Sequence, residues 1–243
     1  MFMRRTKMLA ALFAVLAYLI PAASLPPQEL DRTVYIGRQT RMYPVTIETV
    51  TVGDQVIQTG VMGGPRVLQS GTPFQANNDW LKNMSFVLKN RTNKTIDWAQ
   101  IYVSVPNASE GLTRTLANYP LQLGKIPAND FFTHRDGTLS PHDPGGSPLS
   151  FAPGQTLVIK LGDHLDELQA AFELTVPLEQ VKLISIEPHY FLFRDGMRWD
   201  AAMQGFGIPD PNQPGKFTNM DRGRYFPGDP FQNWPPAAAP SQE

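Results

Sequence analysis

The chain has no cysteine in its 243 residues, and charged residues make up only 18% of it. Without cysteine it cannot form disulfides, a thiol nucleophile, a thiolate-bound metal site or a lipid-modified N-terminal cysteine. Its 42% of hydrophobic residues and its low charge argue against a disordered, solvated tail protein. The length allows one or two domains with a sizeable core. The composition therefore indicates a folded protein without thiol chemistry.

Motifs of several enzyme classes are missing as well. There is no Gly-x-Ser-x-Gly nucleophile elbow, because Gly145-Gly146-Ser147-Pro148 lacks the closing glycine. Gly205-Phe206-Gly207 runs directly into Ile208-Pro209-Asp210, so it is no phosphate-binding glycine motif. Paired carboxylates of a hydrolase meet only in the fold, and nothing in the sequence selects a pair. We therefore expect a protein that is not an enzyme and that needs no cofactor.

Residues 1–24 have the layout of a secretory signal peptide. The basic residues near the start are Arg4, Arg5 and Lys7. The apolar run Met8–Ile20 follows them and is shorter than the ~20 residues that span a bilayer. Small residues come next, and cleavage after Ala23 or after Ser24 fits them equally well. We predict a periplasmic or extracellular protein, with an uncleaved membrane anchor as the alternative.

Loss of this leader would remove basic charge only. It would leave 18 basic against 22 acidic residues, a formal net charge of −4. A net negative chain without a basic cluster gives no reason to expect a polyanionic partner. We predict that the protein does not bind nucleic acid, and that it touches a membrane only through an uncleaved signal segment.

Alternating apolar residues indicate several strands between residues 33 and 203. Val45–Val52 has mostly period two, with one slip near Thr49 that indicates a bulge. Gly53-Asp54 is a turn signal, and Gln55–Val61 is the expected return strand. The pattern predicts a hairpin over this part of the chain.

A later stretch, Val181–Phe193, is partly apolar on both faces, as in a central strand. Pro188 interrupts it and indicates an edge position or a bulge. Asp195-Gly196 is a strong two-residue hairpin signal between apolar flanks.

The most regular unit lies over residues 80–106. One strand face carries Met84, Phe86 and Leu88, and a second carries Ile101, Val103 and Val105. The link Asn90–Lys94 is rich in asparagine, which tolerates turn conformations, so we expect a hairpin-like connection. Two packed sheets would build their core from such faces.

Two strings in the chain resemble those of a known family. Lys89–Ile96 (KNRTNKTI) resembles a KNxTxKxI pattern found in bacterial secreted immunoglobulin-like sandwich domains, of which FxLYD-type domains are the nearest named relatives. Phe151–Thr156 (FAPGQT), followed by Leu157–Ile159, resembles the apolar-x-Pro-Gly entry to a later strand in those modules. The resemblance implies an interaction or structural module without catalytic residues.

We therefore predict an all-β fold: an immunoglobulin-like antiparallel β-sandwich over residues 33–203 with one short helix. Asp163 is expected to cap this helix over His164–Phe172. Residues 204–243 contain 8 prolines among aromatic side chains. Proline keeps a segment out of a central sheet, whereas aromatic rings can bury large areas. We expect an irregular C-terminal arm strapped over the sandwich, with a proline-rich ligand for another domain as the alternative.

One loop carries a candidate metal site. Residues 107–150 are poor in strand signals apart from Tyr119–Leu123. The candidate ligands are His134, Asp136, His142 and Asp143. Imidazole and carboxylate groups suit zinc or another divalent ion, but the two histidines lie far apart in a Pro/Gly-rich loop. We favour a solvated polar loop, and a metal-dependent hydrolase is the alternative.

The function that these observations favour is an exported, non-enzymatic β-sandwich. It would bind a protein or cell-envelope component or serve as a structural module. A carbohydrate-binding module is the alternative, and it requires an exposed platform of tryptophans. The four tryptophans are Trp80, Trp98, Trp199 and Trp234. At least two of them lie in strand patterns, which favours core packing over a platform.

Overall fold

A computed structural model describes most of the chain between residues 30 and 219. The described residues are 30–37, 43–59, 73–107, 109, 114–125, 131–133, 139–141, 147–173, 175–202, 205–210, 212–213 and 216–219. The signal segment and the end of the C-terminal arm lie outside them. Within these ranges no helix is long and apolar enough to cross a membrane.

Strands dominate the described residues. They are β1 (Leu30–Ile36), β2 (Val45–Val52), β3 (Gln55–Thr59), β4 (Phe74–Ala76), β5 (Met84–Asn90), β6 (Ile96–Pro106), β7 (Thr115–Leu123), β8 (Phe131–Thr133), β9 (Leu139–Pro141), β10 (Thr156–Lys160), β11 (Leu183–Phe193), β12 (Arg198–Asp200), β13 (Gly205–Pro209) and β14 (Phe217–Asn219). The helical elements are the short 3-10 turns η2 (Leu161–His164) and η3 (Leu178–Gln180) and the helix α2 (Leu165–Phe172).

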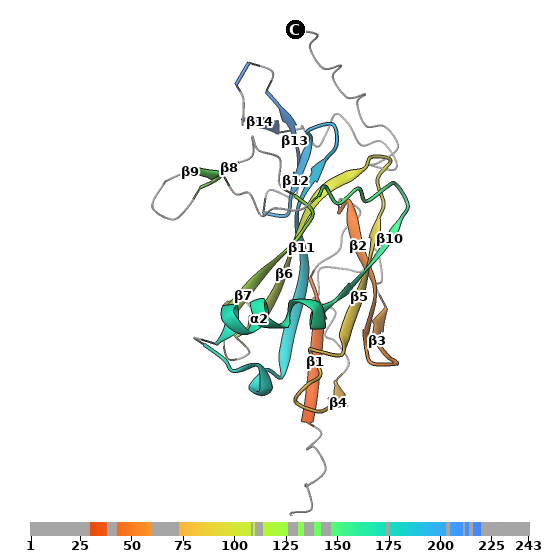
Figure 1. The fold of residues 1–243 in the computed structure, drawn as a ribbon, viewed down its shortest axis with the longest axis vertical. Helices are drawn as coiled ribbons and strands as arrows, with labels where there is room; N and C mark the ends of the chain where they lie inside the picture. The colour runs from red at the N-terminus through yellow and green to blue at the C-terminus, as the bar shows by residue number, and fades with distance from the viewer. Residues whose placement is uncertain are drawn as a thin grey trace, which may run out of the picture.

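Two sheets pack face to face (Figure 1). The smaller sheet has the order β10-β5-β2-β3, and the larger one is built on β7-β6-β11. Consecutive strands β5 and β6 lie in different sheets, and the chain later returns to pair β10 with β5 and β11 with β6. This is the Greek-key connection of an immunoglobulin-like sandwich. The predicted fold class is confirmed.

Two strands, β1 and β12, pair with the same edge of β11. Because β6 occupies the other edge, β1 and β12 must both lie on this one. β1 runs parallel along Leu183–Ile186, and β12 runs antiparallel along Tyr190–Leu192. β4 extends the sheet beyond β1, and β13 and β14 extend it beyond β12. The start of the C-terminal arm therefore forms regular strands, which its proline content did not indicate.

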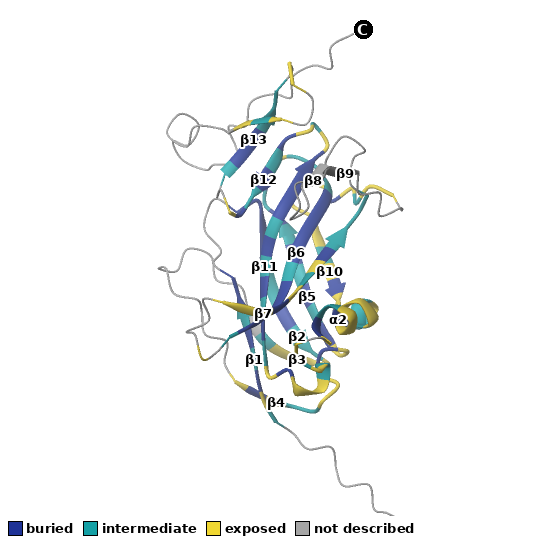
Figure 2. Cartoon of the chain, turned by 90° about the vertical axis from the view of Figure 1, so that its left-hand side faces the viewer, coloured by how far each residue is buried: buried dark blue, intermediate teal, exposed yellow. Residues whose placement is uncertain are grey.

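The core fills the space between the sheets. Met84, Phe86 and Leu88 are buried and share one face of β5, as the alternation predicted. β6 and β11 are the most continuously buried strands (Figure 2). Trp80, Trp98 and Trp199 have no exposed surface. These three tryptophans therefore form no exposed sugar-binding platform, and Trp234 lies outside the described residues.

The asparagine-rich link between β5 and β6 is not a hairpin, so that prediction was wrong. β5 pairs with β2 and β10, whereas β6 pairs with β7 and β11. The link instead carries the chain from one sheet to the other. The error has a simple cause: adjacent alternating strands have the same pattern whether they pair within a sheet or face each other across a core.

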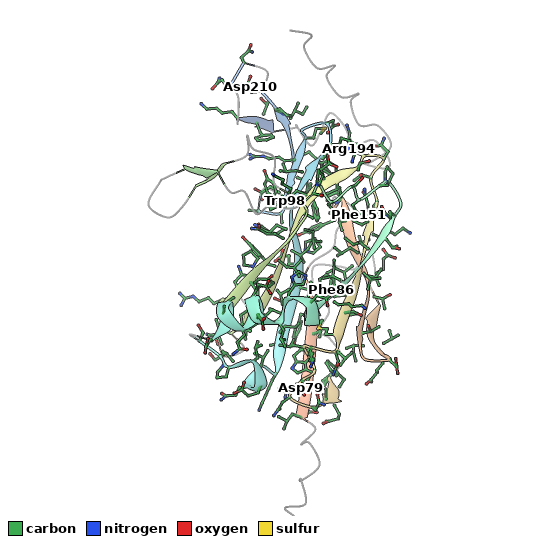
Figure 3. All side chains as sticks on the ribbon, viewed as in Figure 1. Asp79, Phe86, Trp98, Phe151, Arg194 and Asp210 are labelled. Carbon is green, nitrogen blue, oxygen red and sulfur yellow. The ribbon has the colours of Figure 1, made fainter. Side chains whose placement is uncertain are left out.

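Asn90 holds this link in place. Its Oδ1 accepts hydrogen bonds from the backbone N–H of Thr92 at 3.0 Å and from the Thr92 hydroxyl at 2.7 Å. Its Nδ2 donates to the carbonyls of Lys94 at 2.8 Å and Phe151 at 2.9 Å. The two strings that carry the family resemblance thus meet at one buried asparagine, near the end of the sandwich at which Figure 3 labels Phe151.

The predicted turns at Gly53 and Gly196 and the two predicted bulges are confirmed. The register of β2 against β5 shifts between Ile47 and Thr49. Gly53 has a φ of 57° in the β2–β3 turn, a left-handed conformation that favours glycine. Gly196 has a φ of 83° in the β11–β12 hairpin. Pro188 marks a bulge and not an edge, because β11 is paired on both sides.

Among the described residues, the α-helix α2 packs against β7 at one side of the sandwich (Figure 1). Leu168 and Phe172 enter the core from its inner face. Asp163 does not cap it: Asp163 lies in the preceding η2, and His164 occupies the N-cap without a side-chain capping bond. The 3-10 turn moves the start of the α-helix past the residue that the sequence indicated.

Candidate functional site

The candidate metal ligands His134, Asp136, His142 and Asp143 lie outside the described residues, so the metal site stays a prediction. The short β8–β9 pair belongs to the same segment. Within the described ranges, no group of three or more histidine and acidic side chains is arranged to hold a metal ion.

The described residues place a different polar group on the outer face of the larger sheet. In the register of β11 against β6, Pro188 faces Ile101 and Tyr190 faces Gln100, so His189 is an extra residue. Such a bulge bends the strand and turns a side chain to a new direction. Glu187, which faces Tyr102, therefore lies on the same outer face as both His189 and Tyr190.

Four ionisable side chains make up what we call the bulge cluster: Tyr102 on β6, Glu187 and His189 on β11, and Asp200 on β12. The rings of Tyr102 and His189 stack with centroids 4.0 Å apart and planes 26° from parallel. Asp200 faces Tyr190 across the β11–β12 pair. All four side chains are half-buried. Three strands of one sheet thus bring these groups together.

Gly37, directly after β1, makes room for the cluster. A Cβ at this position would lie 2.9 Å from both Cβ and Cγ of Glu187, which is closer than side-chain carbons approach. The N–H of Gly37 donates to the carbonyl of Ile186 at 2.8 Å, so the backbone is fixed here. The stem of Glu187 therefore lies over a position that only glycine fills without displacement.

Burial sets the protonation of the cluster. It raises the pKa of Glu187, because the charged carboxylate loses water. It lowers the pKa of His189, and the negative charge of Asp200 opposes this in part. It also raises the pKa of Tyr102, with Asp200 and then Glu187 adding to the effect. At neutral pH His189 is therefore neutral, and the cluster offers hydrogen-bond donors and acceptors beside an aromatic stack.

A small apolar group lies next to the bulge cluster on the same face. Trp98, Tyr190 and Leu192 form a buried set separate from the main core. The Trp98 and Tyr190 rings meet nearly edge to face, with centroids 5.5 Å apart. Figure 3 labels Trp98 at the upper part of the sheet. These three side chains are therefore buried on the outer face, whereas the side chains of the bulge cluster are half-buried.

Arg198 borders the same region from β12. Its guanidinium lies 4.0 Å from the ring centroid of Phe217 and 6.0 Å from that of Tyr190. Gly207 opposes it, and a Cβ there would lie 3.1 Å from the Arg198 Nε. The positive charge is held by aromatic faces, an arrangement favourable for arginine.

Sequence reasoning missed the bulge cluster, although a signal was present. Glu187-Pro188-His189 places two ionisable side chains around a proline inside an otherwise apolar strand. Bulges are common beside functional sites, and ionisable residues in a central strand need a reason. The partners Tyr102 and Asp200 come from other strands, so no local pattern indicates them.

The comparisons with known proteins add no relative. No family model, no curated protein and no solved structure matches this chain. The resemblance to FxLYD-type domains therefore stays a prediction.

Proposed function

We propose that this protein is an exported, non-enzymatic β-sandwich module that binds a protein or cell-envelope component through the outer face of its larger sheet. The observation that supports this proposal is the bulge cluster. Solvated outer faces of antiparallel sheets usually carry simple polar side chains. Here a bulge, a proline and a close-fitting glycine instead support stacked aromatic rings and half-buried acids.

The chemistry of the cluster suits recognition of a partner surface. Aromatic side chains are enriched at the centres of protein interfaces, where they bury area at small entropic cost. The rings of Tyr102 and His189 are already stacked, so little order is lost on binding. Glu187 and Asp200 offer acceptors to donor groups of a partner, and a basic side chain fits them best.

The outer face of the smaller sheet differs. There the Thr51 and Ser85 hydroxyls bond each other at 2.7 Å between neighbouring strands. Thr46 likewise bonds Glu48 at 2.7 Å. In each of these pairs the two side chains use their hydrogen-bonding groups on each other, so these groups are not left over for a ligand. The contrast favours the larger sheet as the binding face.

Site-directed photo-crosslinking in cells that produce the full chain tests the proposal. A photoreactive residue at Pro120, which faces Tyr102 from β7 and is exposed, would report contacts at the cluster. The matched control position is Val56 on the smaller sheet, 58% exposed. We expect one discrete adduct from position 120 and none of that mass from position 56.

The substitutions Glu187→Gln and Asp200→Asn keep the shape of each side chain but remove its charge. Made together, the two substitutions should reduce the yield of the adduct from position 120 roughly tenfold, a loss typical of residues at the centre of an interface. The proposed binding face would be overturned if the adduct formed with equal yield from positions 120 and 56. It would also be overturned if Glu187→Gln and Asp200→Asn together left the yield from position 120 unchanged.

A further inference from the structure

A second surface lies on the opposite sheet, at the edge strand β10. It pairs with β5 over Thr156–Lys160 without any register shift. In the part of the chain that the structure describes, no segment pairs with its other edge. Thr156, Val158 and Lys160 are exposed, and the Val158 side chain is 57% accessible. A regular, exposed strand edge is a template for pairing with another strand.

The hydrogen-bond pattern shows which backbone groups this edge presents. The N–H of Asn90 donates to the carbonyl of Gln155 at 3.0 Å, and these residues face each other. In an antiparallel pair, bonded and non-bonded positions alternate. Leu157 and Ile159 therefore bond β5, whereas the N–H and C=O groups of Thr156, Val158 and Lys160 point outward.

Two other edge strands of the sandwich, β7 and β3, are protected. β7 carries Pro120 near its middle, and its register shifts between Val105 and Pro106 of β6. β3 pairs with β2 across a shift between Val50 and Thr51. Prolines and bulges are two of the devices that keep edge strands from pairing; charged side chains are another, and β10 carries one at its end, Lys160. β10 has neither a proline nor a bulge, and its inward side chains, Leu157 and Ile159, are apolar.

We propose that two copies of the protein associate by pairing their β10 strands antiparallel about a two-fold axis at Val158. Val158 of one chain then faces Val158 of the other chain, and Thr156 of one chain faces Lys160 of the other. All outward backbone groups find partners in this register, and no like charges are directly opposed. The exposed Val158 side chains cover each other, and the two smaller sheets become one continuous sheet. This association is independent of the proposed binding face.

Sedimentation equilibrium of the full exported chain from about 1 to 300 µM tests the pairing, a range suited to a small interface. As the concentration increases, we expect the average molecular mass to rise from that of one chain to that of two chains. Val158→Pro removes an outward N–H without touching the bonds to β5, and we expect it to raise the dimer dissociation constant at least tenfold. Val158→Thr keeps the N–H and the branched side chain, and should stay within about threefold of the parent.

A thiol test does not depend on the folding of the proline variant. The chain has no cysteine, so Val158→Cys introduces the only thiol. Directly facing bonded positions lie about 5.5 Å apart at Cα, within the range of a disulfide. We expect Val158→Cys to form a covalent dimer at least tenfold faster than Val56→Cys. A parent chain that stays at one-copy mass to 300 µM, or equal cross-linking rates of the two variants, would overturn the proposal.

Discussion

The imidazole of His189 stacks on the phenol of Tyr102, with ring centroids 4.0 Å apart. β11 has one residue more than β6 beside Pro188, so that both His189 and Tyr190 lie on the outer face. Without the bulge, strict alternation would place Tyr190, and with it Asp200 on β12, on the face opposite to Glu187 and His189.

The histidine titration is the first prediction. Burial lowers the pKa of His189 below its ordinary 6.5, and Asp200 acts in the opposite direction. Asp200→Asn should therefore lower the pKa of His189 further. NMR titration of the imidazole carbon-bound protons would measure both values. A pKa of His189 that rises on this substitution would contradict the electrostatic account.

The second prediction concerns stability against pH. Burial raises the pKa of Glu187, so the folded chain holds its proton at pH values where the unfolded chain has lost it. The contribution of Glu187 to stability is therefore present below its ordinary pKa of 4.5 and declines as the pH rises through the folded value. Glu187→Gln should remove this decline and raise the free energy of unfolding at pH 7 by a few tenths to about 1 kcal/mol.

Denaturant titrations of the parent and the Glu187→Gln variant at several pH values would measure this difference. The free energies of unfolding of the two chains should become equal near pH 4, where the parent carboxyl is protonated. If the difference in free energy of unfolding between the two chains grew as the pH fell, the predicted direction of the pH dependence would be wrong.

Gly37→Ala is the third prediction. The added Cβ would lie 2.9 Å from the Glu187 stem, while the backbone bond from Gly37 to Ile186 prevents easy movement. Overpacking of this kind typically costs ~1–3 kcal/mol of unfolding free energy. Chemical denaturation would measure the loss, and nuclear Overhauser contacts between Tyr102 and His189 should weaken in the same variant. An unchanged stability with unchanged contacts would show that the close approach is not needed.

Asn90→Ala is the fourth prediction. It leaves the carbonyls of Lys94 and Phe151 and the groups of Thr92 without their buried partner. Unsatisfied buried polar groups make this loss about 2–4 kcal/mol. Asn93→Ala is the matched control, since Asn93 lies in the same link but is exposed. Equal losses from the two variants in thermal or denaturant unfolding would contradict the role given to Asn90.

Export is the fifth prediction. Intact-mass measurement of the full gene product after expression in a bacterial host should give a chain that begins at Ser24 or Leu25, since the leader has the layout of a cleaved signal. Arg4→Glu with Arg5→Glu should leave precursor uncut in the cytoplasm. A full-length mass in the membrane fraction of the parent would mean that the segment acts as an anchor.

Local sequence determined the individual strands and turns of this protein. Alternation placed Met84, Phe86 and Leu88 on one buried face, and glycine marked the turns at Gly53 and Gly196. These features depend on backbone geometry over a few residues, which the sequence encodes directly. The slip near Thr49 was readable for the same reason.

The tertiary structure alone decided which strands pair. Period two states which side chains share a face, but not which neighbour supplies the backbone hydrogen bonds. So β5 and β6 proved to face each other across the core, and β1 and β12 to share one edge of β11. The bulge cluster follows from that pairing, because Tyr102, His189 and Asp200 come from three strands that only long-range contacts bring together.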